Sequence, residues 1–214
     1  NNKKEEDNSE NIYFIYEIIS MKYNNYFHNK NIEEILQYCY NNYYKKTNNN
    51  YEGKGKLILT DRIYFIGQFK NGLVNGKGKL YDKNGNIIYE GDWANGQIEG
   101  YGKYIDEDGS YYIGQFKNNL KNGDGRLFDK NGNIMYEGEW VDGKREGKGT
   151  FFYKDDTFYN GEWKNNLKNG KGTIIFFVKN TLMYYIGQFM NDFQNGKGKL
   201  YDEKKNLIYE GDWV

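Results

Sequence analysis

Hydrophobic and polar positions alternate along most of this chain. Segments such as "YEGDW" (89–93) and "GKGTF" (147–151) place an aromatic residue or a glycine at every second position, with polar residues between them. Period-two alternation, bounded by Asn-Gly and Asp-Gly turn signals, is typical of β-strands joined by hairpins. The pattern therefore predicts an antiparallel meander over residues 51–214.

The alternating segments belong to a repeat. A glycine two residues after an opening aromatic recurs every 23–26 residues, and the first glycine of a G-x-G pair follows it nine residues later in all six complete repeats. Self-similarity at such a period indicates a repeat architecture, in which each repeat packs on its neighbours. The opening glycines are Gly67, Gly91, Gly114, Gly138, Gly161, Gly187 and Gly211.

Turn and glycine positions predict how one repeat folds. The Asn-Gly pairs at 84–85 and 131–132 supply the positive φ angles that two-residue hairpin turns require. Tyr89, Gly91 and Trp93 share one face of their strand, because side chains alternate between the two faces. We expect the glycine between the two rings to leave room for a ring of the neighbouring repeat to lie on the backbone.

The segment "YEGEWVDGKREGKGTFFYKDDTF" (136–158) resembles a MORN repeat (membrane occupation and recognition nexus), whose hallmark is Y-x-G-x-W/F followed by G-x-G. The resemblance covers residues 51–214, as six complete repeats with a half repeat at each end. Phe65 replaces the opening Tyr, and Phe69, Phe116 and Phe189 replace Trp, without disturbing the glycine spacing.

This resemblance implies a single-layer, elongated and twisted β-sheet with a groove. It also implies a function in protein–protein contact, and phospholipid binding has been attributed to the family as well. The aromatics expected to line the groove are Phe69, Trp93, Phe116, Trp140, Trp163 and Phe189.

The opposite face of the predicted sheet is divided into a polar and an apolar half. The polar half carries carboxylates on first strands and Lys or Arg on second strands, a pattern that favours cross-strand ion pairs. The apolar half forms a row that we call the outer apolar stripe. Its candidate partner-binding residues are Tyr81, Ile105, Tyr111, Phe128, Met135, Phe152 and Phe158.

Two interpretations of the outer apolar stripe stay open. Tight curling of the sheet would bury both apolar rows inside the molecule. Alternatively, the stripe is a docking surface for a helix or a second chain, because large exposed apolar patches are rare unless something binds them.

The sequence of residues 1–50 lacks the repeat and predicts a different organisation from the array. Residues 1–11 are charged and rich in Asn, which favours disorder, and 12–27 is compatible with helix or strand. Residues 31–46 predict a helix, with Asn31 as its cap and Glu34 three positions later. We expect this helical segment to cap the array or to lie in its groove.

Composition and charge restrict the function. Lys+Arg and Asp+Glu both number 30, so the formal net charge is zero and the signs are interleaved, which argues against nucleic acid as a partner. The single cysteine, Cys39, precludes an internal disulfide framework and favours a reduced, cytoplasmic location. No apolar run approaches the ~18 residues of a membrane span.

Catalytic and metal motifs are weak. One histidine, His28, leaves little room for a Ser-His-Asp or Cys-His constellation. The "DKNGN" segments (82–86 and 129–133) place glycine at the wrong position for an EF-hand loop. The sequence therefore predicts no enzyme, no cofactor and no metal.

Basic residues gather in the loops that join the two strands of a repeat. They form one edge of the predicted sheet, where an anionic membrane surface would gain about 1 kcal/mol per cation. The alternative is a solvated edge that resists aggregation. The candidate lipid-binding residues are Lys117, Lys121, Lys144, Arg145, Lys164 and Lys168.

These observations together predict a mainly β protein with a small N-terminal helical segment at 1–50 and a repeat array at 51–214. The predicted function is a non-catalytic scaffold that binds a helical or extended segment of a protein partner and tethers a complex to cytoskeleton or membrane. The alternatives are an anionic phospholipid-binding module and a regulatory segment of a larger enzyme. Exposed edge strands also allow a homodimer.

Overall fold

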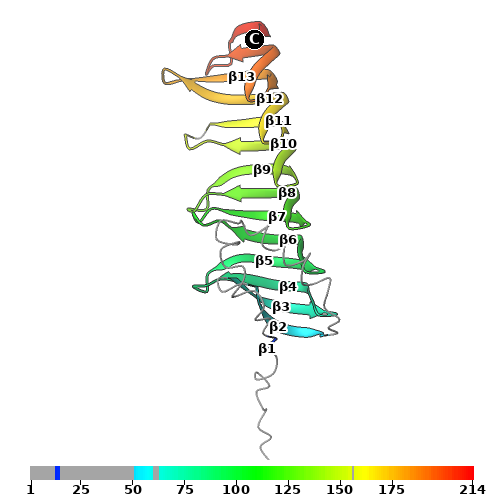
Figure 1. Cartoon of the computed structure of the whole chain (residues 1–214). Helices are drawn as coiled ribbons and strands as arrows, with labels where there is room; N and C mark the ends of the chain where they lie inside the picture. Colours follow the sequence, from blue (N-terminus) through cyan, green and yellow to red (C-terminus); the bar gives the residue numbers. More distant parts are fainter. Residues whose placement is uncertain (1–12, 15–50, 60–62, 156) are drawn as a thin grey trace, which may run out of the picture. The chain divides into compact units, whose positions relative to one another are not determined.

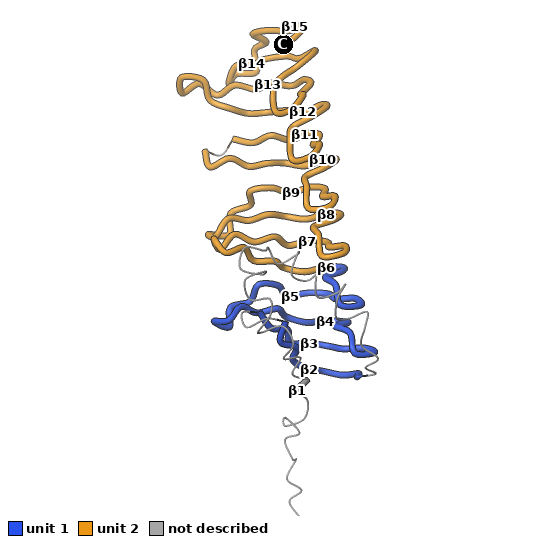
Figure 2. Tube along the Cα trace, in the orientation of Figure 1, with its two compact units in different colours: residues 1–100 blue, residues 101–214 orange. Residues whose placement is uncertain are grey.

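A computed structural model describes residues 13–14, 51–59, 63–155 and 157–214. The described residues form β-strands joined by turns and contain no helix. The chain divides into two compact units, residues 1–100 and 101–214, and the boundary falls within strand β6, Gln97–Ile105 (Figure 2). The helix predicted for 31–46 and the disorder predicted for 1–11 lie outside the described residues.

Unit 1 contains β1 (Tyr13–Phe14), β2 (Gly53–Ile58), β3 (Ile63–Lys70), β4 (Leu73–Asp82) and β5 (Ile87–Ala94). From β2 to β5 each strand pairs antiparallel with the next strand in the chain. The exception is β1, which lies in the segment that the sequence left open between helix and strand and pairs with β2 in parallel.

Unit 2 holds the rest of the array. Its strands after β6 pair antiparallel in chain order from β7 to β15 (Figure 1). Their bounds are β7 Tyr111–Lys117, β8 Leu120–Phe128, β9 Ile134–Val141, β10 Lys144–Phe152, β11 Phe158–Lys164, β12 Leu167–Val178, β13 Thr181–Met190, β14 Phe193–Tyr201 and β15 Leu207–Trp213. The antiparallel meander predicted from the alternation is confirmed in each unit.

Tight turns join the first and second strands of each repeat. The two turn residues both adopt positive φ, as in Asn95-Gly96 (51° and 83°) and Asn118-Asn119 (51° and 69°). Two successive positive φ values define a type I′ turn, which matches the twist of the flanking strands.

The Asn-Gly pairs at 84–85 and 131–132 were wrongly predicted to be two-residue hairpin turns. Only the glycine of each pair has positive φ. Each pair lies in a longer turn, in which Gly85 N donates to Asp82 O and Gly132 N donates to Asp129 O. The aspartate side chain organises this turn by accepting hydrogen bonds from the backbone N–H groups two and four residues later, at 2.8–2.9 Å.

The first glycine of each G-x-G pair sits at a register shift. Gly76, Gly123 and Gly196 adopt φ of 91°, 76° and 74°, a region that favours glycine. In two of these repeats a glutamine of the preceding strand lies over that glycine and accepts the next backbone N–H: Lys77 N donates to Gln68 at 2.9 Å, and Lys197 N to Gln188 at 3.1 Å.

The core is built from rings that lie on paired glycines. A Cβ on Gly114 or Gly125 would fall 2.4 Å and 2.1 Å from the Tyr112 hydroxyl oxygen, and these two glycines face each other across β7 and β8. The covering ring therefore comes from the glycine's own hairpin, two residues earlier, which corrects the prediction of a ring from the neighbouring repeat. The tyrosine hydroxyl continues past the glycines and donates to the Gln115 carbonyl oxygen at 3.1 Å.

Contact between repeats is made by the second aromatic of each opening strand. Trp140 lies edge-on to Tyr136 of its own repeat and to Tyr112 of the preceding repeat, with ring centroids 5.2 and 5.3 Å apart. Its indole nitrogen, Nε1, also donates to the Gly125 carbonyl oxygen at 3.4 Å. The same two-way contact recurs at Trp163, Phe189 and Trp213. We call these second aromatics, together with the opening rings that they contact, the aromatic ladder.

Both predicted half repeats join the array. Tyr51 places its ring 5.7 Å from Phe69 in unit 1, and Tyr209 donates its hydroxyl to the Asp212 carbonyl oxygen at 3.0 Å in unit 2. Each half repeat thus supplies the ring or the hydrogen bond that the complete repeats use.

Candidate functional site

The two faces of each sheet carry different chemistry. One face bears the aromatic ladder, which includes the fully buried rings of Phe65, Tyr112, Tyr136, Tyr159 and Tyr185. The other, which we call the outer face, carries the residues between them in sequence. It therefore holds both the outer apolar stripe and the charged rows.

The outer apolar stripe is half-buried along both units. Each of its seven predicted residues keeps part of its surface accessible and has part of it covered. Cross-strand stacking accounts for part of this cover: Tyr111 stacks on Phe128 in unit 2 and Tyr64 on Tyr81 in unit 1, with centroids 4.7 and 5.0 Å apart and rings within 13° of parallel. Phe152 lies directly opposite Phe158.

Lysines extend the stripe on its charged side. The ammonium nitrogen of Lys103 lies 4.0 Å from the centroid of the Tyr111 ring, and that of Lys56 lies 4.2 Å from the Tyr64 ring. Such contacts contribute about 0.5–1 kcal/mol at exposed sites. The stripe is thus a half-buried apolar surface, rich in aromatic rings, with lysines along one border.

The predicted aromatic groove is the most deeply buried of the candidate sites. Trp93, Phe116, Trp140, Trp163 and Phe189 are only 4–5% exposed, and Phe69 is half-buried. These rings form the core of the ladder, and their burial leaves little surface for a partner. A partner-binding role for them stays a prediction that this burial does not favour.

The predicted lipid-binding cations divide into two groups. Lys117, Lys144 and Lys164 are exposed, whereas Lys121, Arg145 and Lys168 are half-buried. The second group lies over the ladder: Lys121 Nζ is 5.4 Å from the Tyr112 centroid, and the Arg145 guanidinium carbon is 4.3 Å from the Trp163 centroid.

Arg145 is the most integrated of these cations. Its guanidinium lies over Tyr136 and Phe151 as well as Trp163, and its Nη2 donates to the Asn166 carbonyl oxygen at 2.8 Å. Burial lowers the pKa of Arg145 from its usual value. The sequence predicted a loop position for Arg145, but Arg145 is the second residue of β10 and its side chain folds back over the rings.

Four cross-strand ion pairs confirm the predicted charge pairing on the outer face. They are Lys77–Asp92 (2.6 Å), Lys79–Glu90 (3.0 Å), Arg126–Glu137 (3.3 Å) and Lys199–Glu210 (2.9 Å). The Glu90 hydrogen bond and charge raise the pKa of Lys79, and Glu210 does the same for Lys199. Exposed pairs of this kind contribute little to stability.

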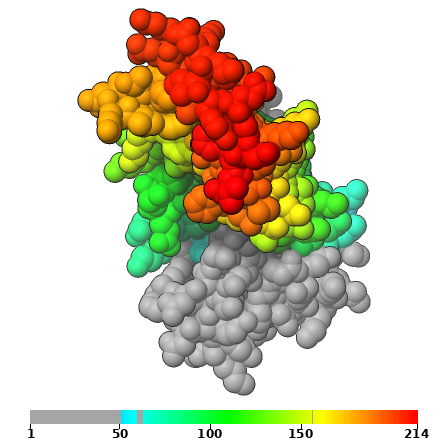
Figure 3. Space-filling model, turned by 90° about the horizontal axis from the view of Figure 1, so that it is seen from above, coloured from blue at the N-terminus to red at the C-terminus, as the bar shows by residue number. Residues whose placement is uncertain are grey.

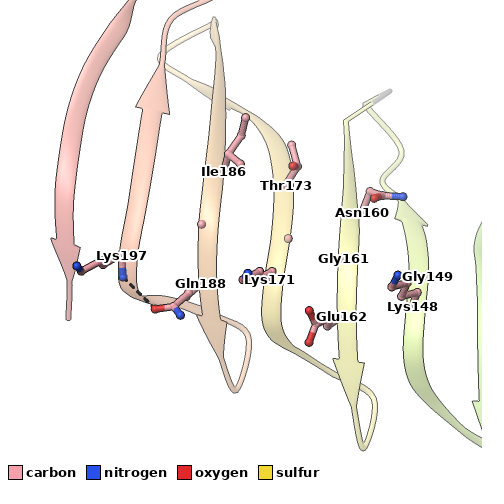
Figure 4. A pocket seen from close by; sticks show the side chains of 12 residues that line it. Lys148, Gly149, Asn160, Gly161, Glu162, Lys171, Thr173, Ile186, Gln188 and Lys197 are labelled. Atoms are coloured by element: carbon pink, nitrogen blue, oxygen red, sulfur yellow. Dashed lines mark hydrogen bonds between the residues drawn. The ribbon is translucent and has the colours of Figure 1, made fainter.

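A shallow hollow of about 620 Å³ lies on the outer face of unit 2, a feature that the sequence analysis did not identify (Figure 4). The backbone of Gly149, Gly161, Gly172 and Gly187 on adjacent strands lines it between the flanking side chains. Lys148, Lys171 and Lys197 border it together with Glu162, and Ile186 and Thr173 lie toward its other end.

Further apolar residues are exposed on the last strands of unit 2. Phe177 and Val178 are 50% and 45% exposed on the β12–β13 hairpin, which extends past its neighbours in Figure 1. Leu207 and Ile208 on β15 are also exposed, and this last strand (red) lies at the surface in Figure 3. The longer repeat at 159–184 has extra residues, which lengthen both strands of that hairpin.

No cluster of three or more His, Cys, Asp or Glu side chains occurs among the described residues. The turn aspartates are engaged instead: the side-chain hydrogen bond from Asn86 holds the pKa of Asp82 below its usual value, and Asn133 does the same for Asp129. Within the described ranges no helix is long and apolar enough to cross a membrane.

Comparison with known proteins identifies the repeat. The family model described as MORN repeat matches six segments, residues 65–87, 89–111, 112–134, 136–158, 159–179 and 185–206, which together make up more than half of the chain. Each segment starts at the opening aromatic that defines a complete repeat in the sequence. A search of the curated proteins finds no significant match to the chain.

MORN repeats are in general modules for protein or membrane interaction rather than enzymatic domains. The match agrees with the paired glycines, the covering tyrosines and the edge-on ladder, which recur at the same positions in successive repeats. The chain therefore belongs to the MORN repeat family.

Proposed function

We propose that this protein is a non-catalytic interaction scaffold that binds a helical or extended segment of a partner protein along the outer apolar stripe. In this proposal the scaffold is cytoplasmic and tethers a complex to the cytoskeleton or to a membrane. Family membership supports the general class, since MORN repeats act as interaction modules.

One observation carries the choice of the stripe. Its rings are half-buried on a sheet whose described residues include no helix, and stacked pairs such as Tyr111–Phe128 hold the rings in fixed positions. A pre-ordered row of half-exposed aromatics offers a large contact area at a small cost in side-chain entropy. Tyrosine and arginine are also enriched among residues that dominate binding energies.

The test compares substitutions at opposite edges of neighbouring strands: Phe128 and Phe152 end β8 and β10, whereas Val141 ends the antiparallel strand β9 between them. Phe128→Asp and Phe152→Asp place a charge within the stripe, and Val141→Asp, at a position 49% exposed beside a tight turn, is the matched control. Full-length tagged protein is incubated with lysate of the source cells, and captured proteins are quantified by mass spectrometry. We expect the two stripe variants to lose a common set of partners that the control retains.

Folding is checked in parallel by circular dichroism. Each stripe variant should keep the wild-type spectrum, because a lost cross-strand pair costs about 0.2–1 kcal/mol. Unfolding of both stripe variants would show that the stripe is core, and equal partner loss in the control would show that it is not the docking surface.

A second candidate function is binding to an anionic membrane surface through the exposed cations Lys117, Lys144 and Lys164. Sedimentation with vesicles containing phosphatidylserine at low salt tests it, with vesicles of phosphatidylcholine as the control. Retention on the anionic vesicles alone, lost when the three lysines are replaced by glutamine, would favour this candidate. Equal sedimentation with both vesicle types would remove it.

A further inference from the structure

One position per repeat lies over the aromatic ladder, nine residues after the opening aromatic. In unit 1 this position holds Val74 and Ile98, both about 1% exposed. In unit 2 it holds Lys121, Arg145, Lys168 and, in the last complete repeat, Gln194, all half-buried. The same place in the fold is therefore filled by buried aliphatic side chains in unit 1 and by half-buried cations in three successive repeats of unit 2.

Each of the three cations rests on aromatic rings. Lys121 Nζ lies 5.4–5.7 Å from the centroids of Tyr104, Tyr112 and Trp140. Lys168 Nζ lies 5.8 Å from the Tyr159 centroid and donates to the Tyr153 hydroxyl oxygen at 3.3 Å. The rings fix the direction of each side chain, so the positive charges form an ordered row.

The row carries charge without a bound carboxylate. None of the ion pairs among the described residues includes Lys121, Arg145 or Lys168. Two nearby carboxylates instead accept backbone hydrogen bonds: Asp192 accepts from Lys168 N at 2.9 Å, and Glu146 accepts from Asn165 N at 2.7 Å. Asp106 and Asp192 lie near enough to interact electrostatically with Lys121 and Arg145, but neither forms an ion pair with them, so the row can still accept negative charge from a partner.

The spacing of the row selects among possible partners. Equivalent residues of successive repeats lie two strands apart, which is about 9.5 Å at the usual strand spacing. An α-helix rises about 1.5 Å per residue, so residues seven apart on a helix are about 10.5 Å apart and remain within about 20° of the same face. Flexible side chains absorb the remaining difference of about 1 Å.

An extended segment does not fit this spacing. Its rise of about 3.3 Å per residue reaches the same distance after about three residues, and residues an odd number apart point to opposite faces. The spacing thus separates the two forms of partner that the sequence had left open, because only a helix presents successive carboxylates to all three cations.

We propose that Lys121, Arg145 and Lys168 recognise an acidic α-helix whose carboxylates recur every seven residues, lying along the ladder face of unit 2. The proposal rests on the proposed scaffold function and names the chemistry of one partner. It adds a second contact surface on the face opposite the outer apolar stripe.

The experiment uses the full chain and synthetic helical peptides. The probe is an alanine-based helical peptide with three glutamates seven positions apart, which places about two helical turns between successive acidic sites. A control peptide has the same composition with the glutamates five positions apart, which spreads them around the helix. We expect fluorescence anisotropy to show the probe binding at least about tenfold more tightly than the control peptide.

Variants of the protein assign the binding to the row. The triple variant Lys121→Met, Arg145→Met and Lys168→Met removes the charges while keeping apolar stems over the rings. The matched variant Lys148→Met, Lys171→Met and Lys197→Met removes three charges around the hollow on the outer face. We expect the first to lose at least about tenfold in affinity for the probe and the second to stay within about twofold.

Thermal melting followed by circular dichroism establishes that the first variant folds, and Arg145→Lys provides a charge-retaining variant that should keep binding. Equal affinity for the two peptides, or equal loss in the two triple variants, would overturn the proposal. Stronger binding of phosphatidylserine vesicles than of the probe, lost in the first triple variant, would also overturn it in favour of a lipid surface. Probe binding does not involve Phe128 or Phe152. If the probe fails to bind, the proposal that the outer apolar stripe binds a partner is therefore unaffected.

Discussion

Gly125 shows at the scale of one residue why the glycines beneath the tyrosine rings cannot be replaced by a larger residue. Its backbone torsions suit any residue, but an added Cβ would lie 2.1–2.4 Å from three atoms of the Tyr112 side chain. The Tyr112 ring cannot retreat easily, because it is fully buried and its hydroxyl is bonded to Gln115. The glycine is required by space rather than by torsion.

We expect Gly125→Ala to lower the unfolding free energy by about 1–3 kcal/mol, the usual cost of overfilling a packed core. The matched control is Gly143→Asn, because Gly143 has φ of 78° and no atom within 4 Å of an added Cβ. Asn119 and Asn166 adopt φ of 69° and 70° at the equivalent turn position. Urea unfolding should place the control within about 0.5 kcal/mol of wild type, and equal losses would contradict the packing argument.

The buried tyrosines predict sensitivity to alkaline pH. Burial raises the pKa of Tyr89, Tyr112, Tyr136 and Tyr159 above their usual value. The folded state then keeps protons that the unfolded state releases above about pH 10. Stability is therefore fully present below that pH and decreases as the pH rises beyond it.

Urea midpoints measured from about pH 8 to pH 11 should fall above pH 10. Tyr136→Phe should lower stability at neutral pH by about 1 kcal/mol, because the hydrogen bond to the Glu139 carbonyl oxygen is lost. The variant should also show a smaller decrease of the urea midpoint with pH above about pH 10, because one ionising group is removed. Phe65 shows that the ring position accepts phenylalanine. A slope unchanged in the variant would contradict this assignment.

The hairpins are the elements on which register depends. Tight turns with two positive φ residues and register shifts near the G-x-G glycines recur in successive repeats. The β12–β13 hairpin is longer than its neighbours and closes with a two-residue turn at Lys179-Asn180 in place of the aspartate-organised turn, and its strands stay paired residue by residue from Phe176↔Met183 to Val178↔Thr181. Its extension is an addition to the repeat rather than a disruption.

Deleting Phe177, Val178, Thr181 and Leu182 should therefore leave the fold intact. The deletion removes two residues from each strand, so the alternation of faces is preserved and the turn at Lys179-Asn180 still connects the strands. We expect a melting temperature within about 3 °C of wild type. As a control, deletion of Phe177 alone shifts the faces of one strand and should destabilise the protein; a normal melting temperature for that variant would contradict the register argument.

At the scale of the whole molecule, stability is distributed over contacts between successive repeats. Trp163 contacts Tyr136 and Tyr159, with centroids 5.4 and 5.2 Å away, and bonds to the Gly149 carbonyl oxygen at 3.0 Å. Each ring thus ties one repeat to the next, and residues further along the chain are reached only through intervening rings. Such an array behaves as a sum of repeat and nearest-neighbour terms.

Trp163→Ala should cost about 3–5 kcal/mol locally. We expect hydrogen exchange to accelerate in β10–β12, which surround the lost ring, and to remain near wild type in β3 and β4 of unit 1. Val141→Asp, whose side chain lies outside the ladder, serves as the control and should change neither region. Uniform acceleration along the whole chain would show that the array unfolds as one cooperative block.

The sequence by itself determined the repeat, the strands and the family, because period-two alternation and glycine offsets are local constraints that every repeat must satisfy. It placed all six opening aromatics where the family model begins its matches. It failed at the turns, since Asn118-Asn119 carries no glycine signal although both residues adopt the required torsions.

Only the tertiary structure decided which ring lies on which glycine and where the long cations go. Alternation fixes the face of a side chain but not its neighbours across the strands, and a register shift changes those neighbours without changing the face. Arg145 shows the consequence: the sequence predicts a loop at one edge of the sheet, yet Arg145 lies in β10 and its guanidinium lies over three rings. Long side chains take the direction that the surrounding packing allows, and that packing is a property of the assembled strands.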